Sequence, residues 1–152
     1  TLADILGKRD AIPARAAEDS FSFLPALTGK ASDRPARPFT IHHSIKGSFA
    51  IRRGPWKLAL CPGSGGWSAP KPGIALKSKT LPLVQLYNLK DDPAERNNLQ
   101  AKHPEIVKDL AAQLATAIHN GRTTPGPKQS NEGWPDTFNA RVLAEFPELK
   151  GK

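Results

Sequence analysis

Apolar and polar side chains alternate along the middle of this 152-residue chain, a pattern typical of half-buried β-strands. The pattern predicts a strand over residues 39–45, a hairpin of two strands that turns at Gly54-Pro55, and a fourth strand over residues 84–89. Because apolar residues recur on one face of each strand, we expect an antiparallel sheet with one buried face.

Two adjacent histidines lie in the first predicted strand, and successive side chains of a strand point to opposite faces. His43 shares its face with Phe39 and Ile41, which favours a histidine of the apolar core. His42 shares its face with Ser44, so we expect it to be exposed and available to a ligand. The same alternation argues against one metal ion bound by both rings.

A helical spacing of apolar residues predicts one long helix over residues 103–120, with Pro104 at its start and Gly121 just past its end. Shorter helices are expected over residues 1–8 and 21–27. A short turn of helix is expected to begin at Asp92-Pro93, and a last helix carries Phe138, Val142 and Phe146. The fold class is therefore α+β: a small, about four-stranded antiparallel sheet packed against one long C-terminal helix, with short lead-in helices and long Pro/Gly-rich loops.

The net charge of +8 is concentrated in one part of the chain. Residues 34–90 contain no acidic residue and ten basic ones: Arg34, Arg37, Lys46, Arg52, Arg53, Lys57, Lys71, Lys77, Lys79 and Lys90. Such a field attracts anions, which include nucleic acid, anionic lipid and sulfated or phosphorylated sugar. A solvated basic surface without a partner explains the same pattern. No apolar run approaches the roughly 18 residues of a membrane-spanning helix, so no membrane partner is expected.

The residues themselves offer no complete catalytic centre. Cys61 is the single cysteine, which excludes an internal disulfide and a cysteine-rich metal site. Ser64 does not lie in a Gly-x-Ser-x-Gly elbow, and the basic stretch holds no pair of carboxylates for acid–base work. We assign no catalytic residue and no metal ligand to this chain.

Binding is the chemistry that remains. Arginine and lysine donate charge-assisted hydrogen bonds to sulfate or carboxylate. The candidate substrate-binding residues are His42, His43, Arg52, Arg53 and Lys57. For the basic ones the plain alternative is a solvated strand surface. Trp67, in the long loop over residues 62–82, could stack on a sugar ring or anchor the loop.

Four segments, in this order, make the chain similar to the C-terminal portion of a type I, formylglycine-dependent sulfatase, an arylsulfatase-like member of the alkaline phosphatase superfamily. The segments are Thr1–Gly7, Ser22–Gly29, the hairpin Ile51-Arg52-x-Gly54-x-Trp56-Lys57-Leu58, and Leu86-Tyr87-Asn88-Leu89 with Asp92-Pro93-x-Glu95-x-x-Asn98-Leu99. Cys61 departs from the Cys-x-Pro-x-Arg pattern of that family's nucleophile.

The resemblance implies a role. Residues 1–37 would be lead-in helices and a linker from a catalytic domain, 38–121 the sulfatase C-terminal subdomain, and 122–152 a loop-rich tail. The subdomain would pack on that upstream domain and help form a pocket for a sulfated carbohydrate, with His42 or His43 as its substrate-contacting histidine. Formylglycine and calcium would belong to the missing catalytic domain, so the isolated chain would be inactive. The family suggests a periplasmic or secreted enzyme.

Two other interpretations stay open. A free-standing binding module for sulfated glycans or other polyanions would need only the basic surface. The C-terminal part of a related phosphodiesterase would share the same motifs. Nucleic acid is a less favoured partner, because the aromatic residues Phe49 and Trp56 are expected to face the core rather than alternate with the basic side chains.

Overall fold

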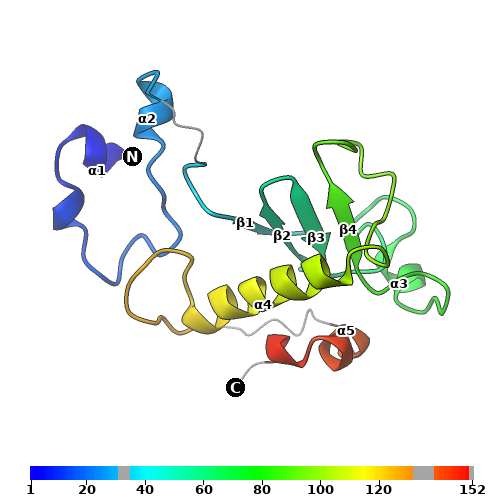
Figure 1. The fold of residues 1–152 in the computed structure, drawn as a ribbon. Coiled ribbons are helices and arrows are strands. Elements are labelled where there is room, and N and C mark those ends of the chain that lie inside the picture. Colours follow the sequence, from blue (N-terminus) through cyan, green and yellow to red (C-terminus); the bar gives the residue numbers. More distant parts are fainter. Residues whose placement is uncertain (31–34, 132–138, 151–152) are drawn as a thin grey trace. The chain divides into compact units, whose positions relative to one another are not determined.

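The structure is a computed structural model that describes residues 1–30, 35–131 and 139–150. It forms two units, one made of Thr1–Pro38 with Thr116–Glu132 and the other of Phe39–Ala115 with Gly133–Lys152. A four-stranded antiparallel sheet and one long helix dominate the second unit, so the predicted α+β class is confirmed (Figure 1). The division into a lead-in, a subdomain and a tail stays a prediction.

The sheet is a meander of β1 (Thr40–His43), β2 (Phe49–Arg53), β3 (Trp56–Ala59) and β4 (Gln85–Asn88), in that spatial order. Gly54 takes the left-handed φ of +56° in the predicted turn between β2 and β3, a conformation that glycine adopts without a steric penalty. One row of paired residues crosses the sheet at Ile51, Leu58 and Leu86, and these three side chains are fully buried.

The long helix α4 (Pro104–Asn120) lies alongside the sheet (Figure 1). Its residues Leu110 and Leu114 are fully buried, as the apolar stripe predicts. Burying a leucine of this kind contributes roughly 1.5–3 kcal/mol before entropy is counted. Gly121 ends the helix with φ of +60°, which confirms the predicted stop. None of the described helices is long and apolar enough to cross a bilayer.

Polar contacts tie α4 to the buried face of the sheet. Arg53 of β2 donates to Gln113 at 3.2 Å and forms an ion pair with Asp109, both on α4. The rings of Trp56 and His103 lie 5.1 Å apart. The helix therefore covers the face that carries Arg53 and Trp56.

The first strand is shorter than predicted, and two expectations about its faces are wrong. β1 ends at His43 because Ser44 starts a tight turn: its amide donates to Ser48, and the Gly47 amide donates back to Ser44. His43 is exposed rather than buried in the core; its ring lies edge-on to Phe49 at 5.9 Å, and its Nδ1 lies 3.2 Å from the Ser44 carbonyl. Ile45, beyond the strand, is 67% exposed.

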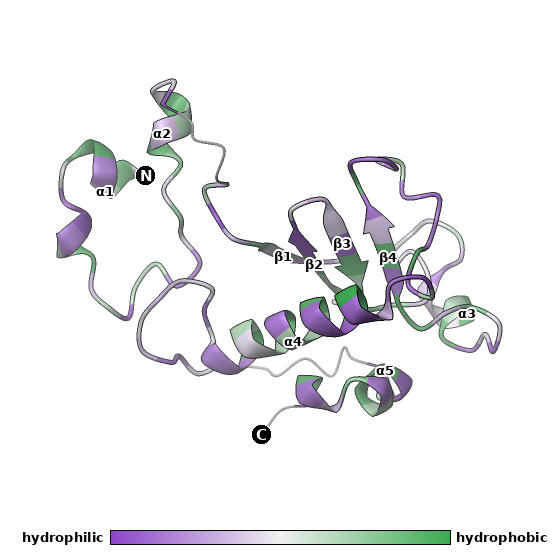
Figure 2. Ribbon diagram, in the orientation of Figure 1, coloured by the Kyte–Doolittle hydropathy of each residue, from purple (hydrophilic) through white to green (hydrophobic). Residues whose placement is uncertain are grey.

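The short helices are single turns: α1 (Leu2–Ile5), η1 (Arg9–Ala11), α2 (Leu24–Leu27), α3 (Pro72–Ala75) and η2 (Pro147–Leu149). The helix expected over residues 21–27 begins only at Leu24, where Pro25 in its first turn needs no amide partner. The helix expected at Asp92-Pro93 is instead a turn, in which the Glu95 amide donates to the Asp92 carbonyl. Leu2 and Ile5 of α1 and Leu27 of α2 are apolar and exposed. Figure 2 colours both helices partly green, for hydrophobic residues.

The expected terminal helix is α5 (Ala140–Glu145), capped by Asn139, whose side chain accepts from the Arg141 amide at 2.7 Å. Val142 and Phe146 are buried as predicted. Phe138 and Arg34 lie outside the described residues.

In the first unit a buried arginine joins the start of the chain to the segment after α4. Arg122 is only 7% exposed, and its guanidinium donates to the carbonyls of Ala14, Thr124 and Pro127 and to the Thr124 hydroxyl. Nearby, Asp19 accepts from the amide and hydroxyl of Thr123. These neutral acceptors replace the water that the buried cation has lost.

The outer edge of β4 is closed by the segment that follows the strand. Asn98 accepts from the Leu86 amide at 3.0 Å and donates to the Val84 carbonyl at 3.1 Å, and the Leu99 amide donates to the Leu86 carbonyl. The Asp92 carboxylate positions this segment by accepting from the Asn97 amide at 2.7 Å.

Candidate functional site

The sheet face opposite α4 carries polar side chains in register. The strand pairing puts Thr40, Arg52, Lys57 and Tyr87 in one row across all four strands. His42 lies on the same face in the neighbouring row, because residues two apart on a strand share a face. We call His42, Arg52, Lys57, Gln85, Tyr87 and the Glu95 that reaches them the polar face.

Lys57 and Glu95 form the central ion pair of the polar face. The ammonium Nζ of Lys57 lies 2.6 and 2.8 Å from the two carboxylate oxygens of Glu95, so one lysine serves both. The side chains are 20% and 35% exposed, respectively. Glu95 has a φ of +55°, which is uncommon for a residue with a side chain. The loop after β4 thus holds a strained residue whose carboxylate neutralises a lysine of the sheet.

Partial burial and neighbouring positive charge both lower the pKa of His42. The loss of solvent contact around its ring lowers the pKa of His42, and the nearby charge of Lys57 lowers it further, against a smaller opposing effect of Glu95. Its imidazole is therefore mainly neutral at pH 7. An anion bound beside it would favour the protonated form and raise that pKa.

A hydrogen-bonded chain joins the polar face to the long loop. The Tyr87 hydroxyl donates to Gln85 Oε1 at 2.7 Å, and Gln85 Nε2 donates to the carbonyls of Cys61 and Gly63 at 2.8 and 2.9 Å. Burial raises the pKa of Tyr87, and the charge of Glu95 adds to that effect. The phenol therefore stays protonated and can hold the loop in place.

The Cys61 thiol is partly buried at the start of the long loop. Its Sγ donates to the Gly63 carbonyl at 3.2 Å, and burial raises the pKa of the thiol. A raised pKa lowers the fraction of Cys61 that is present as the reactive thiolate.

The five predicted binding residues divide between two faces. His42, Arg52 and Lys57 come together on the polar face. His43 and Arg53 lie on the opposite face, where Arg53 donates a hydrogen bond to Gln113 of α4. Their assignment as substrate-binding residues stays a prediction, and the geometry favours the first three.

Sequence reasoning missed Glu95, Gln85 and Tyr87 as members of this surface. Glu95 belongs to the Asp92-Pro93-x-Glu95 motif, but its position 38 residues beyond Lys57 carries no sign of their contact. Residues 34–90 contain no acidic residue, but in the folded chain the Glu95 carboxylate contacts Lys57 of this stretch.

The polar face has cationic groups that can hold an anion. Arg52 is exposed, and Lys57 has donor capacity beyond its carboxylate partner. Within residues 1–30, 35–131 and 139–150 no group of three or more His, Cys, Asp or Glu side chains could hold a metal ion.

Comparison with known proteins gives the relationship. A curated protein, N-acetylgalactosamine-6-O-sulfatase of Bacteroides thetaiotaomicron, is 33% identical over 106 residues, which make up 68% of this chain. This chain is related to the sulfatases. The match spans 19% of the relative's length, so the sulfatase-related chain corresponds to about one fifth of that protein. No protein-family model matches the chain.

A solved structure supports the relationship. It belongs to a study of the metabolism of multiple glycosaminoglycans by Bacteroides thetaiotaomicron, and it aligns with a TM-score of 0.56 and 30% sequence identity. The alignment covers 76% of the sulfatase-related chain and 23% of that structure. The recognition made from the hairpin and the Asp-Pro motif is therefore confirmed.

Proposed function

We propose that this chain is the C-terminal subdomain of an enzyme that hydrolyses sulfate esters of a sulfated carbohydrate. The proposal rests on two observations taken together. The chain is related to sulfatases, and Arg52, Lys57 and His42 lie on one face of its sheet. The similar protein is named for a 6-O-sulfate on N-acetylgalactosamine, so we propose a 6-O-sulfated N-acetylhexosamine as the substrate class.

In this proposal the polar face is one wall of the substrate pocket and does no bond breaking itself. Arg52 and Lys57 bind an anionic group of the carbohydrate, and His42 donates a hydrogen bond once that group raises its pKa. Formylglycine and calcium, which supply the nucleophile and hold the sulfate in type I sulfatases, would be carried by polypeptide beyond this chain. A periplasmic or secreted location follows the same family expectation.

The test uses the polypeptide of the whole reading frame that contains this segment. Sulfate release from 6-O-sulfated N-acetylgalactosamine is measured for the wild type, for Lys57→Met and for the control Lys90→Met, which removes an exposed charge outside the polar face. We expect Lys57→Met to raise KM roughly tenfold with a smaller change in kcat, as loss of a substrate-binding contact does. The isolated 152 residues should show no turnover, with or without calcium. Hydrolysis by the isolated chain, or equal KM values for Lys57→Met and wild type, contradicts the proposal.

A further inference from the structure

The long loop between β3 and β4 exposes a tryptophan that the polar face does not use. Trp67 is 82% exposed. Single exposed apolar residues are common on protein surfaces, but tryptophan is usually buried over most of its area. An indole exposed on an ordered loop of this chain is accessible to a partner.

The loop around Trp67 is closed by its own hydrogen bonds. The Ser64 amide donates to the Pro70 carbonyl at 3.3 Å, and the Ser64 hydroxyl donates to the Ser68 carbonyl at 2.7 Å and accepts from the Gly66 amide. Residues 65–69 are thus the tip of a closed turn, and Trp67 is its central residue. An aromatic side chain presented in this way loses little freedom on binding.

The tip rests on the turn between β1 and β2. A methyl group placed at Gly65 would lie 2.9 Å from the Ser44 side chain, and one at Gly66 would lie 3.5 Å from Ile45. Glycine at position 65 permits this close approach because it has no side chain. It also adopts the left-handed φ of +66° at this position without a steric penalty. The two loops form one ordered surface, with the exposed side chains of Ile45 and Trp67 on it.

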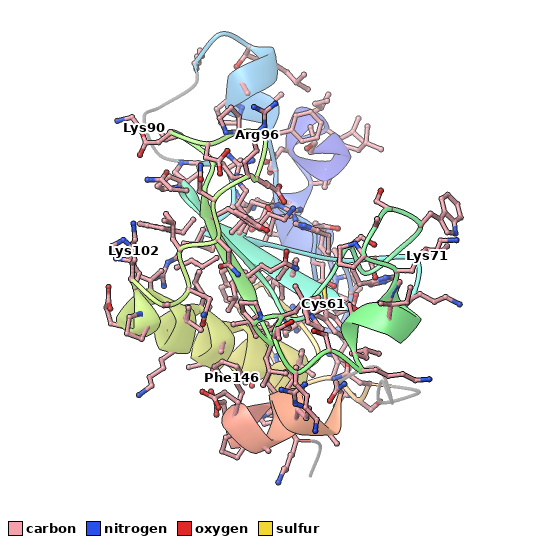
Figure 3. The ribbon with its side chains drawn as sticks, turned by 90° about the vertical axis from the view of Figure 1, so that its right-hand side faces the viewer. Cys61, Lys71, Lys90, Arg96, Lys102 and Phe146 are labelled. Carbon is pink, nitrogen blue, oxygen red and sulfur yellow. The ribbon has the colours of Figure 1, made fainter. Side chains whose placement is uncertain are left out.

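Lysines flank this surface, and there is no carboxylate in either loop. Lys46 follows Ile45 and lines a cavity of about 150 Å³ between the two loops, together with Ser48, Pro72 and Leu76. Lys71 follows the bond that closes the tip and lies on the outer side of the loop, whereas Cys61 lies inward (Figure 3). The two adjoining loops thus carry one exposed indole and two lysines, Lys46 in one loop and Lys71 in the other.

From this geometry we infer that Trp67, with Lys46 and Lys71, forms a second carbohydrate-binding site that stacks on a pyranose ring and pairs with its sulfate or carboxylate group. A pyranose ring presents an apolar C–H face, which fits the negative face of an indole. Ammonium groups beside the ring supply charge-assisted hydrogen bonds to an attached anion. The inference rests on the proposed function for its ligand class, and it places a contact for a neighbouring sugar away from the polar face.

The test measures binding of defined oligosaccharides to the 152-residue chain by calorimetry and NMR. The probes are a chondroitin 6-sulfate hexasaccharide, its unsulfated counterpart and a six-nucleotide oligothymidylate. We expect Trp67→Ala to weaken binding of the sulfated probe roughly five- to thirtyfold, which corresponds to about 1–2 kcal/mol. Trp67→Phe should retain part of the affinity. The double variant Lys46→Ala/Lys71→Ala should reduce the affinity to that of the unsulfated probe.

Matched controls isolate the site. Phe23→Ala removes another exposed aromatic ring, which belongs to the first unit, and Lys90→Ala removes another exposed lysine. Both should bind like the wild type. The indole N–H signal of Trp67, assigned by its loss in Trp67→Phe, should shift when the sulfated probe is titrated into the wild-type chain.

The outcomes separate this inference from the proposed function. Binding that survives Trp67→Ala but is lost in Lys57→Met overturns the Trp67 site and leaves the polar face in place. Binding that depends on Trp67 but equally favours oligothymidylate shows a base-stacking surface and overturns the carbohydrate assignment. The absence of binding to any sulfated probe contradicts both.

Discussion

Removing the ammonium of Lys57 should destabilise the chain by an amount that its half-buried position sets. Fully exposed ion pairs contribute about 0.2–1 kcal/mol, whereas breaking a buried pair costs about 3–5 kcal/mol. Lys57 is 20% exposed and Glu95 35%, and both carboxylate oxygens accept from one ammonium. We therefore expect Lys57→Met to lower the free energy of unfolding by about 1–2 kcal/mol, between the two limits.

A double-mutant cycle separates this pair from the loss of side-chain packing. Urea unfolding is measured for Lys57→Met, Glu95→Gln and the double variant, and we expect a coupling energy of about 1 kcal/mol. The reference is the cycle Arg53→Gln and Asp109→Asn, whose ion pair is more exposed and should couple more weakly. Added salt should reduce the coupling of the exposed pair first. A Lys57–Glu95 coupling no larger than the reference refutes the reasoning that burial strengthens this pair.

Three further predictions follow from the same structure. Leu114→Ala should lower the free energy of unfolding by about 2–5 kcal/mol, because the side chain is fully buried; a loss below 1 kcal/mol in urea unfolding speaks against that packing. Arg122→Ala should cost about 3 kcal/mol, since it leaves several buried carbonyls without a donor, and Arg122→Lys should recover little; equal melting temperatures for all three proteins contradict this. By NMR, His42 should titrate below about 6.5, and Lys57→Met should raise its midpoint. Since an anion favours protonated His42, affinity for the sulfated probe should increase as the pH falls toward that midpoint, and a pH-independent affinity argues against His42 as a contact.

Regular local patterns were sufficient for most of the fold. The apolar spacing between Pro104 and Gly121 defines α4 because a helix needs only its own residues to set its period and its ends. The β2–β3 hairpin is equally local, since Gly54-Pro55 makes the turn and the alternation of Trp56 and Leu58 sets the face. Both elements were correctly predicted.

The failures lie where distant residues decide the outcome. Alternation alone put His43 in the core, but β1 is an edge strand of the sheet, and His43 is its last residue before the turn at Ser44. The Lys57–Glu95 pair depends on a loop that folds back over the sheet with a left-handed residue, which no periodic pattern reports. The sequence therefore identified the basic residues of the candidate site, whereas the contact of Glu95 with Lys57 is evident only in the folded structure.

The amide of Asn98 gives the Asp-Pro motif a structural meaning. An unpaired β-strand can recruit another chain, and here the Asn98 side chain and the Leu99 amide hydrogen-bond to the flank of β4 as a neighbouring strand would. The motif by which the relationship was recognised therefore occupies hydrogen-bonding groups at an open edge of the sheet. Replacing Asn98 would expose those groups of Leu86 and Val84 to another strand.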